Sequence, residues 1–115
     1  NFFLYFSDDD LCRKIKNLNK SIIQSKEATC IHQHGNLKIK NKLKKIFIRE
    51  FHFTFDQLYY FYKLNKKSNI LVKYERKFFN NLIKAFVKLI LFQLNNAVAK
   101  FATCLAYIKF KKTYK

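Results

Sequence analysis

Hydrophobic residues near the amino terminus recur at the spacing of one helix face. Ser7 suits an N-cap position, and the aspartates at positions 8–10 place negative charge at the positive end of a helix dipole. Asp10 also stands where a capping box requires a carboxylate. The pattern predicts a helix that begins at Ser7 and has an apolar face of Leu11, Ile15, Leu18 and Ile22.

A second helical pattern begins at Asn36, directly after Gly35. Apolar residues fall on one side of it, and lysines cover most of the remainder. The spacing therefore predicts a second amphipathic helix in this part of the chain. The residues that share its less basic side are Ile39, Leu43, Ile46, Phe47 and Glu50.

Three shorter segments have the character of β-strands. Residues 28–33 form a short candidate, and residues 70–74 follow a polar break. Residues 51–64 are rich in aromatic side chains, which favour strands. Within that segment Phe51, Phe53 and Phe55 alternate at strand period.

The last third of the chain fits two patterns. As a helix, residues 78–102 carry a narrow polar stripe; as strands, residues 83–92 and 103–110 are apolar runs separated by residues 93–96. Periodicity alone does not decide between them. The polar stripe of the helical alternative consists of Asn81, Lys84, Lys88, Asn95 and Lys100.

The charge of the chain indicates the kind of partner that it binds. The chain has 24 lysines and arginines against 7 aspartates and glutamates, a formal net charge of +17, which favours a polyanionic partner. Because 50% of the residues are hydrophobic and 18% are aromatic, we expect a folded domain and not a basic tail. Only Arg13, Arg49 and Arg76 are arginines, and lysine suits phosphate neutralisation better than base reading. Structured RNA is the expected partner.

Composition also indicates a compartment. Residues with AT-rich codons abound (Lys, Asn, Ile, Phe and Tyr), whereas among residues with GC-rich codons Pro is absent and Gly occurs once, which is typical of an AT-rich, organellar genome. Cys12, Cys30 and Cys104 show no paired spacing, so we expect reduced, small apolar core residues in place of disulfides. A mitochondrial matrix location fits both features.

Candidate catalytic and metal-binding groups are few. Cys30, His32 and His34 form a C-x-H-x-H cluster, but structural zinc usually takes a second ligand pair, and His52 and Cys104 are isolated. A chain with one glycine holds no P-loop, G-x-S-x-G or dinucleotide fingerprint. We therefore expect no metal, no cofactor and no enzymatic activity.

The apolar segment from residue 78 to residue 110 raises the question of a membrane. Lys84 and Lys88 interrupt it, so no uncharged apolar run of about 18 residues remains. We expect this segment to supply core. The alternative is an amphipathic helix that lies along anionic lipid with its lysines on the polar face.

Four segments resemble, in the same order, parts of one known family. They are residues 10–17 (DLCRKIKN), 37–53, 69–74 (NILVKY) and 97–110 (AVAKFATCLAYIKF). They are similar to the D-x-(L/I)-(T/S)-R-I-R-N opening, the second helix, the I-x-V-x-L-K-Y strand and the closing segment of small-subunit ribosomal protein S-eight. That family's S-T-S-x-G loop would fall at residues 92–96, where its motif is not preserved.

The resemblance implies an α/β fold: an α-β-α-β-β amino-terminal domain over residues 1–76, then a small portion over residues 77–115. The second portion would be β-rich, or one helix plus a strand. The resemblance also implies binding to ribosomal RNA beside neighbouring ribosomal proteins. The expected phosphate contacts are Arg13, Lys14, Lys16, Asn17, Lys38, Lys40, Lys42, Lys45, Lys111 and Lys112.

We therefore predict a structural protein of the mitochondrial small ribosomal subunit that binds ribosomal RNA through lysine–phosphate contacts. Two alternatives stay open. One is a lineage-specific mitochondrial ribosomal protein of another fold, and the other is a basic accessory subunit of an inner-membrane complex. A membrane is an expected partner only in the last case.

Overall fold

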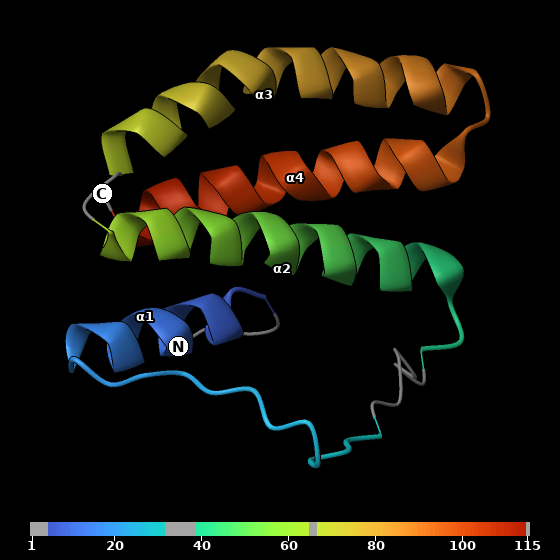
Figure 1. Cartoon of the computed structure of the whole chain (residues 1–115). Coiled ribbons are helices and arrows are strands. Elements are labelled where there is room, and N and C mark those ends of the chain that lie inside the picture. The colour runs from blue at the N-terminus through green and yellow to red at the C-terminus, as the bar shows by residue number, and fades with distance from the viewer. Residues whose placement is uncertain (1–4, 32–38, 65–66, 115) are drawn as a thin grey trace.

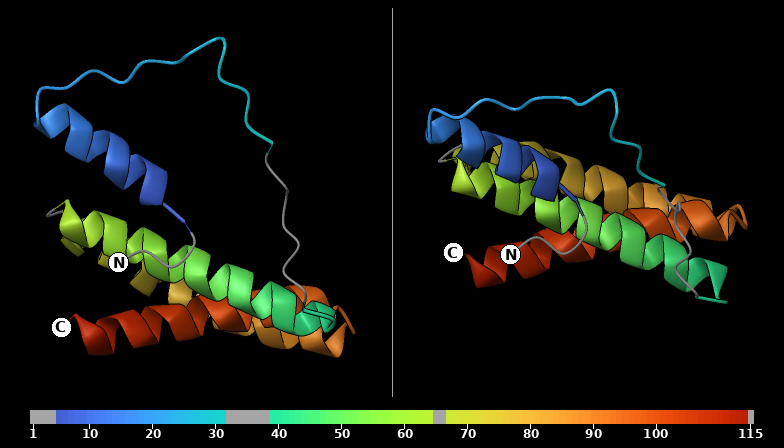
Figure 2. Two further views of the ribbon diagram at one scale, coloured as in Figure 1. Left: turned by 90° about the horizontal axis from the view of Figure 1, so that it is seen from below. Right: turned by 60° about the horizontal axis from the view of Figure 1, so that its bottom comes forward.

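Four α-helices make up the structure, a computed structural model that describes residues 5–31, 39–64 and 67–114 (Figure 1). The helices are α1 (Ser7–Asn17), α2 (Lys42–Lys63), α3 (Lys67–Ile90) and α4 (Leu94–Thr113). Helix α4 lies between α2 and α3 and packs against both, with α2 parallel and α3 antiparallel to it. Helix α1 lies along the carboxy-terminal half of α2. The Cα atoms span 51 × 35 × 20 Å, so the molecule is a thin slab (Figure 2).

The predicted α/β fold is wrong, because no residue of the described ranges is in a β-strand. The aromatic segment from residue 51 lies within α2, and residues 70–74 lie within α3. The apolar run 103–110 is part of α4. Residues 28–31 are irregular, and the remainder of that predicted strand lies outside the described residues.

Helix α2 shows the physical reason for this error. Its aromatic side chains recur at spacings of four as well as two, so the segment satisfies both the helix and the strand period. The rings of Phe51 and Phe55, one turn apart, stack with centroids 6.1 Å apart, and Phe55 meets Phe110 of α4 at 5.7 Å. The packing of these rings against α4 therefore favours a helix over a strand in this segment. Asn41 caps it by accepting a hydrogen bond from the backbone N–H of Lys44 at 3.1 Å.

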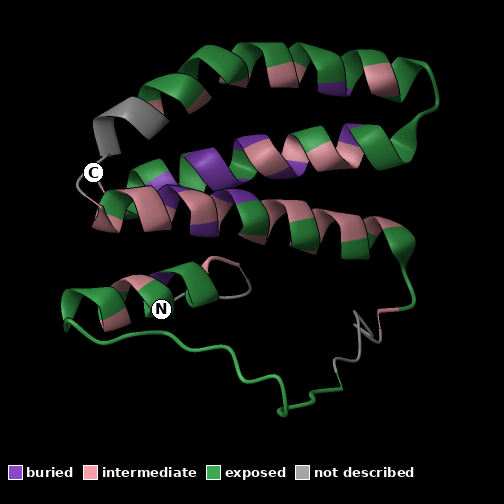
Figure 3. Ribbon diagram, in the orientation of Figure 1, coloured by how far each residue is buried: buried purple, intermediate pink, exposed green. Residues whose placement is uncertain are grey.

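The core lies where α4 meets α2 and α3 (Figure 3). Leu58, Tyr107 and Phe110 are buried there. Ala102 and Ala106 precede Phe110 by two turns and one turn and are fully buried, so they let α4 approach α2 closely. The partly buried residues around this cluster are Phe55, Tyr59, Phe61, Leu71, Tyr74, Phe78 and Tyr114.

The segment that precedes α1 contacts α2 through aromatic rings and through a buried carboxylate of α2. The ring of Phe6 lies beside Phe53 and Tyr60, with centroids 5.7 and 5.6 Å apart. The backbone N–H of Tyr5 donates a hydrogen bond to Oδ2 of Asp56 at 2.9 Å. Asp56 is buried on α2, so this bond fixes the segment that enters α1.

The predicted start of α1 is confirmed, but its cap and its apolar face are not. Ser7 is the first helical residue, and the N-cap is Phe6, in a left-handed backbone conformation without a side-chain capping bond. The helix ends at Asn17, so Leu18 and Ile22 lie beyond it, and both are exposed. The buried residue of α1 is Asp10.

The last third of the chain forms two helices, which neither predicted alternative described. Helix α3 runs without a break through the boundary expected between residues 76 and 77. It ends at Ile90, and residues 91–93 form a tight turn into α4. Helix α2 begins at Lys42, later than the predicted start at Asn36, which lies outside the described residues.

Candidate nucleic-acid interface

The predicted phosphate contacts do not form one cluster. One group lies toward the end of α2, with some members on α1 and the others at the end of α4, and another lies where α2 begins, about 33 Å away along α2 at 1.5 Å per residue. Lys38 lies outside the described residues. The first group is Arg13, Lys14, Lys16, Asn17, Lys111 and Lys112, and the second is Lys40, Lys42 and Lys45.

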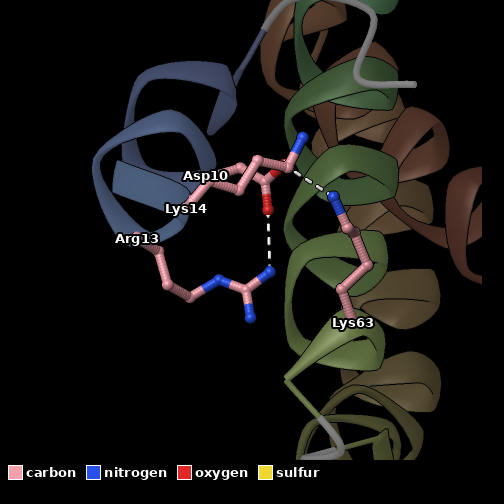
Figure 4. A network of polar contacts seen from close by, with 4 residues as sticks. All are labelled: Asp10, Arg13, Lys14 and Lys63. Carbon is pink, nitrogen blue, oxygen red and sulfur yellow. Dashed lines mark hydrogen bonds and ion pairs between the residues drawn. The ribbon is translucent and has the colours of Figure 1, made fainter. Parts of the chain in front are cut away.

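Two cations of the first group surround the buried carboxylate of α1 (Figure 4). Asp10 is 3% exposed; its Oδ1 lies 2.9 Å from Nη2 of Arg13, and its Oδ2 lies 3.1 Å from Nζ of Lys14. Lys63 reaches it from α2, with Nζ 2.6 Å from Oδ2. The hydrogen bonds from Lys63 and Arg13 hold the pKa of Asp10 well below its ordinary value. This network ties α1 to α2 and engages charge that was expected to contact phosphate.

Another predicted contact is paired in the same way. Nζ of Lys111 on α4 lies 3.1 Å from Oε1 of Glu75 on α3, and this hydrogen bond raises the pKa of Lys111. Lys112 beside it is exposed. At the end of α4, the ammonium group of Lys111 therefore stabilises the contact with α3, whereas Lys112 is exposed to a partner.

A polar hollow of about 270 Å³ opens where α2, α3 and α4 meet. Lysines line it from two helices, and hydroxyl and amide groups add further hydrogen-bond donors. The one carboxylate in its lining, Glu50, is paired with Arg49 at 2.8 Å. Such a lining suits an anion with several oxygen atoms, such as phosphate. The polar residues of the lining are Lys73, Lys77, Lys100, Thr54, Gln57, Tyr74, Asn81 and Thr103; the Tyr74 hydroxyl donates to Gln57, and the Thr103 hydroxyl donates to the backbone carbonyl of Ala99.

The lysines of α3 continue past this hollow as a stripe. Lys73, Lys77, Lys84 and Lys88 follow one another at spacings of four, seven and four residues, which places them on one side of the helix. The stripe is about 22 Å long. Within the described part of the chain, no ion pair engages these four ammonium groups. We call these residues the lysine stripe.

Sequence reasoning did not name the lysine stripe as a contact surface. Residues 70–74 were expected to be a strand, which separated Lys73 from the helix that carries it. The signal was present in the helical alternative for residues 78–102, whose polar stripe included Lys84, Lys88 and Lys100. Helix α3 joins Lys84 and Lys88 to Lys73 and Lys77, because it begins earlier than either alternative allowed, whereas Lys100 lies on α4.

The remaining chemical candidates are the histidines and cysteines, only some of which the structure describes. Among the described residues, no group of three or more His, Cys, Asp or Glu side chains could hold a metal ion. Cys30 is exposed, while His32 and His34 lie outside the described residues. Cys12 is also exposed, contrary to expectation, whereas Cys104 is buried and burial raises its pKa.

No protein-family model, curated protein or solved structure matches this chain. The α/β fold that the resemblance to ribosomal protein S-eight implies is not the fold of the described residues, so that family's RNA contacts are not carried over. No described helix combines the length and the apolar character that crossing a membrane requires.

Proposed function

We propose that the chain is a structural RNA-binding protein of a ribonucleoprotein particle, and that this particle is the mitochondrial ribosome. The observation that carries the proposal is the lysine stripe of α3 beside the polar hollow. The net charge of +17 and the AT-rich composition support an RNA partner in an organelle. With an all-helical fold, the favoured alternative is a ribosomal protein outside the S-eight family.

The mechanism is neutralisation of the phosphate backbone. Lys73, Lys77 and Lys100 surround the polar hollow, where a single phosphate would meet ammonium, hydroxyl and amide donors together. Lys84 and Lys88 would contact further phosphates of the same RNA strand. Binding displaces counterions from the RNA, and recognition follows backbone shape because lysine, as a point charge, suits phosphate better than base reading. The protein thereby stabilises one arrangement of RNA helices.

Substitution of the lysine stripe tests this function. Lys77→Gln combined with Lys84→Gln should lower the affinity for double-helical RNA about tenfold at moderate salt, the low end of what losing two phosphate contacts costs. The slope of log affinity against log salt should fall by about 1 for each lost contact. Fluorescence anisotropy at several salt concentrations measures both quantities.

The matched control is Lys20→Gln combined with Lys26→Gln. These lysines are exposed in the loop after α1, and the change in net charge is the same. The control should retain most of the affinity and the slope. Equal losses in the two double variants would show that net charge alone governs binding, and the proposed interface would be wrong.

A further inference from the structure

Helix α3 carries a second exposed stripe, which is apolar. Its members are 44% to 75% exposed and recur at helical spacing on one side of α3, beside the lysine stripe. Another side of the same helix, with Leu71, Phe78 and Ala85, packs into the core. Much of α3 therefore faces solvent, although its residues are apolar (Figure 3). The members of this stripe are Val72, Phe79, Ile83, Phe86, Val87 and Ile90.

This apolar surface continues onto α4. The ring of Phe86 meets that of Phe101 on α4, with centroids 5.4 Å apart. An open hollow of about 400 Å³ lies between the two helices, and both Phe79 and Ile108 line it. Leu105 on α4 is 46% exposed. We call the α3 stripe together with Phe92, Leu94, Phe101, Leu105 and Ile108 the apolar face.

The turn between α3 and α4 presents the most exposed ring of this face. Phe92 adopts φ 55°, a left-handed conformation that normally favours glycine. The backbone N–H of Gln93 donates to the carbonyl of Lys88 at 2.8 Å, which closes the turn. The Phe92 ring is 90% exposed. A phenylalanine that is held in an unfavourable backbone conformation with its ring exposed to solvent indicates that the ring has a function.

Charge limits what could cover the apolar face. Lysines lie beside it on both helices, Lys84 and Lys88 on α3 and Lys109 on α4, and Lys111 and Lys112 line the hollow within it. Glu75, the described carboxylate beside it, is paired with Lys111. A second copy of the chain would bring another +17 to the same place, so self-association is disfavoured. The face fits a partner that is both apolar and anionic.

We propose that the apolar face lies on an anionic phospholipid membrane. Phe92 and Ile90 at the turn would enter the acyl boundary, and the lysines of both helices would reach the headgroups. A helix of a partner protein would fill the hollow between α3 and α4 but leave the turn uncovered, whereas a membrane covers both. This inference does not rest on RNA binding, because the apolar residues that define the face lie outside the lysine stripe, although Lys84 and Lys88 belong to that stripe and also lie beside the face.

Vesicle flotation tests the proposal on the RNA-free chain. The wild type should float with vesicles of phosphatidylcholine and phosphatidylglycerol, and much less with phosphatidylcholine alone. The combined substitution Ile83→Asn, Ile90→Asn and Phe92→Asn should lower this partitioning more than tenfold. Asparagine tolerates the left-handed conformation, so the turn is retained. Phe92→Gly alone relieves the backbone and should lower partitioning several-fold, which keeps the test valid if the triple variant misfolds.

The matched control replaces exposed isoleucines elsewhere. Ile23→Asn with Ile31→Asn alters side chains that are 84% and 92% exposed in the loop before α2, and it should float like the wild type. All variants should keep their RNA affinity, which separates this proposal from the proposed function. Equal flotation of the wild type and the apolar-face variants would overturn the proposal, as would a wild type that floats with neither vesicle.

Discussion

Asp10 joins the amino-terminal helix to the bundle. Its carboxylate is buried, and Arg13, Lys14 and Lys63 bond to it, the last of these from another helix. A buried carboxylate is stable only when hydrogen bonds and cations compensate for its lost hydration. Here they do so, and folding lowers the pKa of Asp10 as a result. The docking of α1 therefore depends on the charge of one residue.

Asp10→Asn should lower the free energy of unfolding by about 1.5–3 kcal/mol, the range for hydrogen bonds to charged groups. Because the folded-state pKa lies below the ordinary value of 3.8, the unfolded state binds more protons in acid. The stabilisation is therefore complete above that value and is lost as the pH falls below it. Urea unfolding at about pH 7 and about pH 3 measures the difference between variant and wild type, which should shrink in acid.

The control for this prediction is Asp9→Asn, an exposed carboxylate in the same turn of α1. It should change the free energy of unfolding by less than about 0.5 kcal/mol. A difference between wild type and Asp10→Asn that stays the same at both pH values would contradict the ionic role of Asp10.

At the scale of helices, local signals placed α1 and part of α2 correctly. The residues 8–10 mark the start of α1, and the spacing of Leu43, Ile46 and Phe47 belongs to α2 as predicted. The aromatic segment after them was not predictable, because its period fits a strand equally well. What decides for the helix is α4, whose small residues lie about forty positions later in the chain. The lysine stripe was missed for the same reason, since it exists only once α3 is one helix.

The packing of α4 against α2 can be tested by a substitution at Ala106. This residue is fully buried on the side of α4 that carries Phe110 toward α2. Ala106→Leu should lower the free energy of unfolding by about 1–3 kcal/mol, because the larger side chain forces the helices apart. Urea unfolding measures the change. The control is Lys109→Leu, on the exposed side of α4, which should change the free energy of unfolding little. An Ala106→Leu variant that is as stable as the wild type would show that α4 does not pack on α2.

At the scale of the whole molecule, the slab exposes two unlike surfaces on α3. The lysine stripe suits a polyanion, and the apolar face beside it suits an anionic membrane. Self-repulsion at +17 disfavours the isolated folded chain, and either partner relieves that repulsion. The two proposed contacts share Lys84 and Lys88, and the apolar face is therefore tested by variants that leave these lysines unchanged.

Gradient fractionation of a detergent-treated mitochondrial lysate, with and without RNase, tests the RNA-binding function most directly. Detergent removes the lipid, so binding to the bilayer does not contribute to sedimentation, and RNase separates a ribonucleoprotein from a protein complex. The chain should sediment with a ribosomal subunit, and RNase should release it. Sedimentation with a membrane protein complex, unchanged by RNase, or recovery at the top of both gradients would contradict a ribosomal role.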